Sequence, residues 1–416
     1  MTPPPAALER YLAARLLSVT GGLVSLVALP VLVYRLTGSA GWTSAVAMAE
    51  ALPYLLFGLV AGALADRVDR RTLMVGADLV VAVALLTLPL AWWLDVLTAP
   101  HVVAVAFAAQ TAFVFFDAAN FGALPTLVGR DRITDAYAKL FGRTTLAELV
   151  VPPAAGLLVA VVAPAGLIAV NAVTALGSAL LIRGVAGALS GPRPAQASLI
   201  RDIGGGLRFV WGHPVIRTLT LVGALPSAAA GAYVAVLVPW ADQVLHVSAG
   251  GDLRLAVLFS CWGVGALLSS RLVPTLTRRW GGARLALGAL PVSLACALLT
   301  VGTTQWVVAG LAAAAWGAAH STVVINAVTY RQRLCPEDMQ SRVNTTARMV
   351  SWGLGQPAGA ALAGTVAVAA GPRVGLAAGV GVLLVGVVLA WATPTLRRAA
   401  REQDHQTQDH LQRNPL

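Results

Sequence analysis

Apolar residues occur along this chain in long runs that short polar segments interrupt. A helix of about 20 apolar residues is long enough to cross a bilayer core about 30 Å thick. Twelve runs reach that length, so we predict an all-α polytopic membrane protein with twelve transmembrane helices. The predicted ranges are 11–35, 43–65, 72–94, 101–127, 138–162, 166–187, 216–240, 254–276, 284–303, 305–330, 344–369 and 373–393.

Composition and charge agree with a membrane protein. Hydrophobic residues make up 57% of the chain and charged residues 11%, too few charges to cover a soluble surface. If the N-terminus is cytoplasmic, the outer loops hold only Arg35, Arg254 and Arg373 among the 29 basic residues. This asymmetry predicts a multi-pass protein with both termini in the cytoplasm. It also explains the net charge of +11, so we expect no nucleic-acid partner. The predominance of Arg over Lys, with much Ala, Val and Gly, favours a bacterial protein, so we expect it in a bacterial inner membrane.

Sites for metals, nucleotides and cofactors are not predicted. Cys261, Cys296 and Cys335 are scattered without paired spacing, which indicates neither a disulfide framework nor a thiolate metal site. The sequence lacks a phosphate-binding loop of the Gly-x4-Gly-Lys-Ser/Thr type and a catalytic constellation, so we predict neither an ATP-driven pump nor an enzyme. The first apolar run is expected to be a retained span, because no cleavage pattern follows a basic segment.

Similar features recur about 204–208 residues apart, which predicts two pseudo-symmetric six-helix bundles. Arg70-Arg71 at the start of the third run recur as Arg278-Arg279, which we place at the start of the ninth run. Pro153 recurs as Pro357. The predicted domains are an N-terminal bundle over 1–187, a cytoplasmic connector over 188–215, a C-terminal bundle over 216–393 and a polar cytoplasmic tail over 394–416. Within the connector, residues 202–214 favour an amphipathic helix on the membrane surface, although a plain linker fits as well.

A charged segment between the second and third runs is the clearest functional signal. It reads Gly-Ala-Leu-Ala-Asp-Arg-Val-Asp-Arg-Arg-Thr-Leu over 62–73. Ions so close to hydrocarbon are expensive, which favours a paired, functional element. The segment resembles the gate loop of the major facilitator superfamily of secondary transporters. The resemblance implies that a gate motif latches the cytoplasmic gate, although the arginines alone would also serve as topology anchors. The residues of this gate motif would be Gly62, Asp66, Arg67, Arg70, Arg71 and Asp78. Arg15, at a depth comparable to that of Asp78, would belong to the same network.

Three further segments, 116–125, 202–217 and 329–343, narrow this resemblance to the macrolide-efflux and siderophore-export branch of the drug:proton antiporters. Two positions depart from the pattern. Asp69 replaces the second glycine of the gate loop, and Pro152-Pro153-Ala-Ala-Gly156 replaces a Gly-Pro-x-x-Gly-Gly motif. We expect Pro152, Pro153 and Gly156 to bend their helix, and Pro357 to bend its counterpart. Gly58-x-x-x-Gly62 and Gly355-x-x-x-Gly359 would permit close helix contact.

Ionisable residues within the apolar runs are candidates for proton coupling. They are Asp117, Glu50, Glu148 and Arg143. Asp117 lies in the fourth run, which lines the central cavity in the family that the chain resembles. Asp117 and Arg143 lie at similar depths on consecutive helices, which suggests an ion pair. That pair would be either a proton switch or the structural neutralisation of two buried charges.

Four residues in the fourth and tenth runs are candidates for contact with a substrate, namely Gln110, Phe113, His320 and Asn326. Aromatic stripes are also common as packing or lipid-facing residues, and a lone histidine is often a satisfied core residue. The resemblance implies a monomeric, proton-coupled exporter of an amphipathic small molecule that works by alternating access, with the lipid bilayer as its other partner. Alternatives are a siderophore or native-metabolite exporter, and a membrane receptor or scaffold that does not transport.

Overall fold

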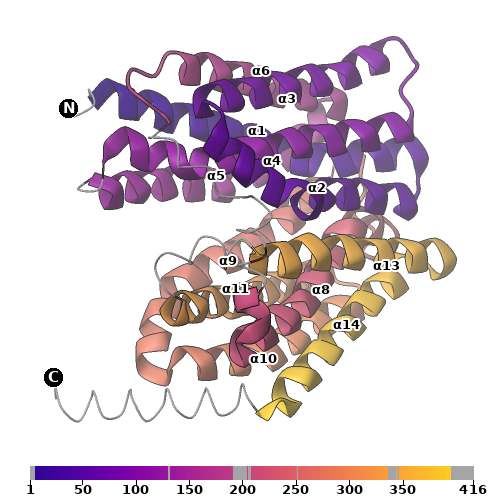
Figure 1. Cartoon of the computed structure of the whole chain (residues 1–416). Helices are drawn as coiled ribbons and strands as arrows, with labels where there is room; N and C mark the ends of the chain where they lie inside the picture. The colour runs from indigo at the N-terminus through magenta and orange to yellow at the C-terminus, as the bar shows by residue number, and fades with distance from the viewer. Residues whose placement is uncertain are drawn as a thin grey trace, which may run out of the picture. The chain divides into compact units, whose positions relative to one another are not determined.

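In the computed structural model the described residues are 5–129, 132–190, 204, 208–250, 252–335, 343 and 346–394, and this part of the chain contains helices and no strand (Figure 1). The first six helices are α1 (Pro5–Thr37), α2 (Ala40–Arg67), α3 (Arg70–Trp93), α4 (Ala99–Val128), α5 (Ile133–Val161) and α6 (Pro164–Arg183). The later elements are α8 (Pro214–Val244), α9 (Leu253–Trp280), α10 (Gly282–Gly302), α11 (Trp306–Leu334), the π-helical turn η3 (Met349–Leu354), α13 (Gly355–Ala370) and α14 (Pro372–Ala392).

The helices coincide with the predicted apolar runs. Among the described residues, ten helices are long and apolar enough to cross a membrane. The other two predicted runs correspond to α5, which carries several charged residues, and to η3 with the short α13. The all-α prediction is therefore confirmed, while the count of twelve spans stays a prediction.

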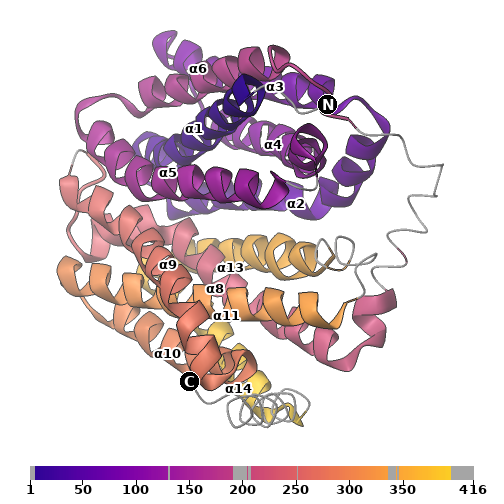
Figure 2. The same cartoon turned by 90° about the vertical axis from the view of Figure 1, so that its left-hand side faces the viewer.

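Contacts divide the chain into two compact units. The first comprises Met1–Leu199 with Ser248–Ala256, and the second comprises Ile200–Val247 with Val257–Leu416. In the first unit α1 packs against α6 and α5, α2 packs against α4, and α3 packs against α4 and α6 (Figure 2). In the second unit α8 packs against α13 and α14, and α10 packs against α11. The exact limits of bundles, connector and tail stay predictions, and the tail beyond residue 394 lies outside the described residues.

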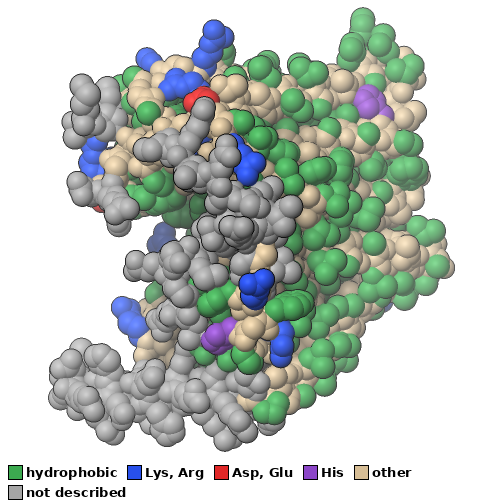
Figure 3. Space-filling model, viewed as in Figure 1, with side chains coloured by type: hydrophobic (Ala, Val, Ile, Leu, Met, Phe, Trp, Pro, Cys, Tyr) green, Lys and Arg blue, Asp and Glu red, His purple; other side chains and the backbone are tan. Residues whose placement is uncertain are grey.

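Exposed apolar side chains cover much of the visible helical surface (Figure 3). They include large residues on many helices, for example Val83, Trp93, Val161, Leu180 and Leu311. A soluble protein would bury such side chains, whereas a bilayer solvates them. The surface is therefore that of a protein whose helices face lipid.

Glycines set the closest helix contacts in the second unit. An added Cβ at Gly359 of α13 would lie 1.8 Å from the carbonyl oxygen of Ala228 on α8, so only glycine fits. Gly355 approaches Ala224 in the same way. In contrast, no described atom lies within 4 Å of an added Cβ at Gly58 or Gly62. The pair on α13 is therefore used for close helix contact, whereas no described helix approaches the pair on α2.

Two local features modify what the sequence predicts. The turn η3 widens the helix just before Pro357, whose missing N–H removes one backbone hydrogen bond from that region. Arg278 and Arg279 lie in the last turn of α9, which corresponds to the eighth predicted run (254–276). Placing them at the start of the ninth run is therefore wrong. Cationic side chains suit a helix C-terminus, and α9 continues until Gly281 adopts a φ of +78°.

The later described part of the connector, from residue 208, packs on the second unit. Residues 208–212 are helical, and Val210 is buried with Ile216, Cys335 and Val343. Trp211 next to it is exposed. One face of this segment is therefore buried against the bundle, and the adjacent face is open.

Candidate functional site

An ion pair inside the first unit is the central feature of the candidate site. The guanidinium of Arg15 on α1 donates to the carboxylate of Asp117 on α4, with Nη2 and Oδ1 2.8 Å apart. The two side chains are 12% and 16% exposed, so the pair is largely removed from solvent. Charges in such surroundings are retained only when paired and hydrogen-bonded.

The predicted pairing of Asp117 with Arg143 is wrong. Arg143 instead pairs with Glu9, with Nη2 and Oε2 2.8 Å apart, and both side chains are considerably more exposed. The physical reason is the position of α1, which packs along α5 and also contacts α4. Helix α1 thus presents Arg15 to Asp117 and Glu9 to Arg143, although the sequence places α4 and α5 next to each other.

Aromatic residues surround the Arg15–Asp117 pair. The Arg15 Cζ lies 5.5 Å from the ring centroids of both Phe113 and Phe116 on α4. The Tyr54 hydroxyl on α2 donates to Asp117 Oδ2 over 3.4 Å. Rings that face a guanidinium attract it electrostatically, so they hold Arg15 in addition to the carboxylate. Sequence reasoning missed Tyr54, for which no charge or motif gave a signal.

The other predicted ionisable residues do not join this pair. Glu50 on α2 is partly buried and Glu148 on α5 is exposed, and neither forms a salt bridge with a described residue. Asp78 on α3 is buried in the first unit. Gln110 on α4 is partly buried, whereas its neighbour Phe113 lies beside Arg15.

The gate loop forms a hydrogen-bonded clasp. Asp66 pairs with Arg70 at 3.1 Å, and Arg70 Nη1 donates to the carbonyl of Gly122 over 2.9 Å and to Thr126 Oγ1 over 3.2 Å. An added Cβ at Gly122 would lie 2.2 Å from Arg70 Cζ, so the guanidinium occupies the space of a side chain. Arg71 donates to the carbonyl of Arg183 over 2.9 Å and to that of Gly187 over 2.7 Å. Arg67 is exposed.

Asp69, the departure from the family pattern, caps α3. Its Oδ1 accepts from the Thr72 N–H over 2.9 Å, and its Oδ2 accepts from the Ser190 hydroxyl over 3.1 Å. The same hydroxyl oxygen accepts from the Arg70 N–H over 2.9 Å. These bonds, led by the one from the Thr72 backbone, hold the pKa of Asp69 below its usual range. An aspartate three residues before Thr72 was an N-cap signal that sequence reasoning did not use.

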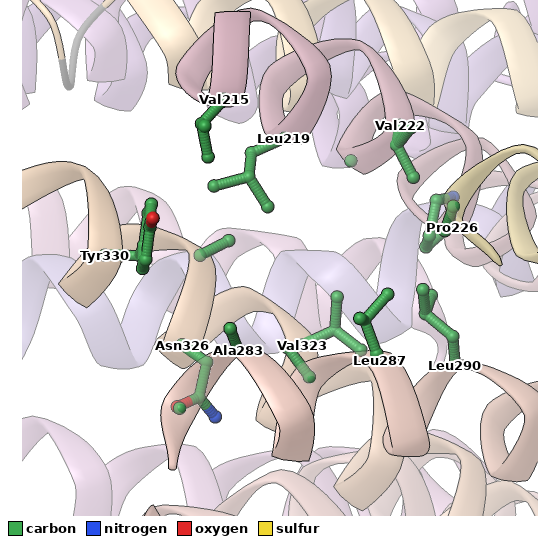
Figure 4. Close-up of a pocket in the computed structure, with 15 residues that line it drawn as sticks. Val215, Leu219, Val222, Pro226, Ala283, Leu287, Leu290, Val323, Asn326 and Tyr330 are labelled. Carbon is green, nitrogen blue, oxygen red and sulfur yellow. The ribbon is translucent and has the colours of Figure 1, made fainter. Parts of the chain in front are cut away.

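The second unit separates its two predicted substrate residues. Asn326 lines an apolar cavity of about 60 Å³ between α8, α10, α11 and α14, near Tyr330 at one end of the pocket in Figure 4. Its amide accepts from Thr277 Oγ1 over 3.1 Å and donates to the Thr322 carbonyl over 2.9 Å. His320 is buried elsewhere on α11, with its ring centroid 5.4 Å from that of Trp262. Within the described residues no cluster of potential metal ligands is found.

Comparison with known proteins agrees with a transporter. The family model MFS_3, described as "Transmembrane secretion effector", matches residues 7–416. The multidrug efflux pump Tap of Mycobacterium tuberculosis (strain ATCC 25618 / H37Rv) is 32% identical over 312 residues, which are 72% of this chain and 70% of that protein. The enterobactin exporter EntS of Escherichia coli O1:K1 / APEC is 28% identical over 406 residues, covering 95% and 93%.

Solved structures show the same fold. The nucleoside transporter NupG aligns with a TM-score of 0.74 at 14% identity, covering 94% of this chain and 98% of that one. An inward-facing bacterial homologue of the lysosomal transporter Spinster aligns with a TM-score of 0.72 at 13% identity, covering 96% and 98%. The predicted fold, multi-pass membrane location and transporter class are thereby confirmed. The chain belongs to the MFS_3 family of transmembrane secretion effectors, in the macrolide-efflux and siderophore-export branch of the major facilitator superfamily.

Proposed function

We propose that this protein exports an amphipathic small molecule, drug-like or a secondary metabolite, by alternating access in exchange for protons. The similarity to multidrug efflux pump Tap supports a drug-like substrate. The similarity to the enterobactin exporter, which extends over 95% of this chain, supports a second candidate, export of a siderophore or native metabolite. Both candidates share the same coupling chemistry.

The Arg15–Asp117 ion pair is the observation that carries the proposal. Asp117 is an acceptor while ionised and becomes neutral when it takes up a proton, whereas arginine stays charged. Protonation therefore removes the charge that holds Arg15 at 2.8 Å and leaves the guanidinium to the rings of Phe113 and Phe116. Since the pair joins α1 to α4, its opening and closing would change how these helices pack during the transport cycle. The sequence left open whether an ion pair of Asp117 is a proton switch or a structural neutralisation of two buried charges. For the observed pair with Arg15 we favour the proton switch.

The gate loop is proposed to hold one end of the first unit closed, on the cytoplasmic side. Asp66 and Arg70 tie the end of α2 to α4, and Arg71 ties the start of α3 to the end of α6. Gly62 and Arg67 lie on the adjoining turns of α2, and Asp78 lies deeper in α3. The arginines here bind backbone carbonyls as well as carboxylates, which favours a latch over simple topology anchors.

Transport into liposomes tests the proposal. The purified protein should move ethidium when a pH gradient is imposed, and Asp117→Asn should abolish or uncouple that movement. Asp95→Asn serves as a matched control, because Asp95 is an exposed aspartate of the same unit and forms no ion pair with a described residue. Folding of each variant is checked by gel filtration and circular dichroism. Gradient-driven transport that persists unchanged in a folded Asp117→Asn variant would remove Asp117 from the coupling role.

A further inference from the structure

Four aromatic side chains form a continuous group inside the second unit, away from the ion pair. They are Tyr233 on α8, Trp262 on α9, and Trp316 and His320 on α11, and we call them the aromatic cluster. Trp262 is its centre, with ring centroids 5.4 Å from Tyr233, 5.1 Å from Trp316 and 5.4 Å from His320. Tyr233 and Trp316 also meet edge to face at 5.5 Å.

Close backbone contact brings the cluster together. An added Cβ at Gly265 of α9 would lie 1.8 Å from the carbonyl oxygen of Ala314 on α11, and one at Gly317 would lie 2.5 Å from the carbonyl oxygen of Trp262. These two glycines let α9 and α11 touch along their backbones. Trp262 therefore lies directly beside Trp316 and His320, one turn of α11 apart.

The polar atoms of the cluster are the unusual part. Tyr233 Oη, Trp316 Nε1 and His320 Nδ1 are all buried and have no hydrogen-bond partner among the described residues. Tyr233 is 2% exposed, Trp316 0% and His320 7%, whereas Trp262 is only partly buried. Buried donors without acceptors are disfavoured, and most are satisfied in folded proteins. Packing alone would be served equally well by phenylalanine, which brings no such atoms.

We infer that the aromatic cluster is a binding site for a flat aromatic ring system that carries oxygen acceptors. Trp262, which is only partly buried, provides an indole for stacking, and the Tyr233 hydroxyl and the Trp316 N–H provide donors that such a ligand satisfies. A ligand with acceptors gains more binding free energy here than at a site whose donors already have partners, because its hydrogen bonds replace none within the protein. The inference rests on the proposed function, since it names the substrate class of the exporter, but it assigns binding to the second unit and coupling to the first.

Equilibrium binding to the full-length protein in lipid nanodiscs, without a pH gradient, tests this inference. The two probes are doxorubicin, a planar fluorescent anthraquinone with carbonyl and hydroxyl oxygens, and ethidium, a planar cation without carbonyl oxygens. Trp262→Ala should weaken both by about tenfold or more, because the stacking surface is lost. Tyr233→Phe keeps the ring and removes only the hydroxyl, so it should weaken doxorubicin by about fivefold to tenfold and leave ethidium within about twofold.

The matched control is Tyr137→Phe, since Tyr137 also stacks on an aromatic ring, that of Phe141 at 5.9 Å, but in the first unit. It should change neither affinity. Equal losses for both probes in Tyr233→Phe, unchanged binding in folded Trp262→Ala, or a wild-type protein that binds neither probe would each overturn the inference. Asp117→Asn should bind both probes normally. If the cluster variants behave as expected while Asp117→Asn still transports, only the proposed coupling fails.

Discussion

A double-mutant cycle on Arg15 and Asp117 gives the most direct measure of the buried ion pair. Asp117→Asn leaves Arg15 charged and largely buried without its partner, and arginine cannot lose its proton. Removing one partner of a buried pair costs about 3–5 kcal/mol, and the rings of Phe113 and Phe116 retain about 0.5–2 kcal/mol of cation–π attraction. We therefore expect Asp117→Asn to lower the free energy of unfolding by about 3 kcal/mol.

Arg15→Met should cost less. The unpaired carboxylate of Asp117 can become neutral by taking up a proton, whereas an unpaired arginine stays charged. The expected loss is about 1–2 kcal/mol, including the lost ring contacts. The double variant has no charge at the site and should lie within about 1 kcal/mol of the wild type, because apolar replacement of a buried pair is often neutral. The cycle then yields a coupling energy of about 3–5 kcal/mol.

The assay is denaturant-induced unfolding of the purified protein in detergent micelles, followed by far-ultraviolet circular dichroism. The control cycle uses Glu9→Gln and Arg143→Met, whose parent side chains are 50% and 37% exposed. That pair should show a coupling energy of no more than about 1 kcal/mol. Additive single variants at Arg15 and Asp117, or Arg15→Met being the more damaging of the two, would refute the reasoning.

Three further outcomes are expected. Asp69→Ala should lower the free energy of unfolding by about 1 kcal/mol at pH 7 through loss of the α3 cap. The pKa of Asp69 is lowered in the fold, so its contribution is fully present above the ordinary aspartate pKa of about 3.9 and is lost as the pH falls through the lowered pKa. Unfolding curves measured from pH 7 downward will show this loss. Gly265→Ala should lower the free energy of unfolding by about 1–3 kcal/mol, because its Cβ would meet the Ala314 carbonyl. The control is Gly288→Ala on α10, where no described atom lies within 4 Å of the added Cβ; it should be neutral or slightly stabilising in the same assay. Arg143→Ala should leave ethidium transport unchanged, and a loss there would restore the pairing that the structure excludes.

The sequence predicted the fold because hydrophobic length and charge asymmetry act along the chain. The same information could not identify the partner of Asp117. Sequence position gives the depth of a residue in a span, but the direction of its side chain depends on which helices are neighbours, and α1 lies against both α4 and α5. Reasoning from position along the chain therefore paired Asp117 with Arg143 on the next helix in sequence, whereas the partner of Asp117 is Arg15 on α1.

Motifs were informative in a similar, limited way. Glycine spacing shows that a helix permits close approach, not that another helix approaches, which is why the spacing at Gly355 and Gly359 produced a contact and that at Gly58 and Gly62 did not. The aromatic cluster draws its four members from three helices, and no local pattern marks Tyr233 and Trp262 as neighbours. Such sites need the packing itself.

Arginine accounts for all but one of the basic residues, and the gate-loop clasp suggests a use for this preference beyond charge. Arg71 reaches two carbonyls at the end of α6, Arg10 reaches the carbonyl of Gly184 nearby, and Arg373 reaches those of Val301 and Gly302 at the end of α10. Helix ends near hydrocarbon have carbonyl groups that little water can satisfy, and a planar guanidinium offers several donors at once. Lysine would preserve the topological charge, but its three donors share one nitrogen and lack the planar fork of a guanidinium. A lysine-rich version of this protein would therefore insert with the same orientation, but the carbonyl groups at its helix ends would be less well hydrogen-bonded.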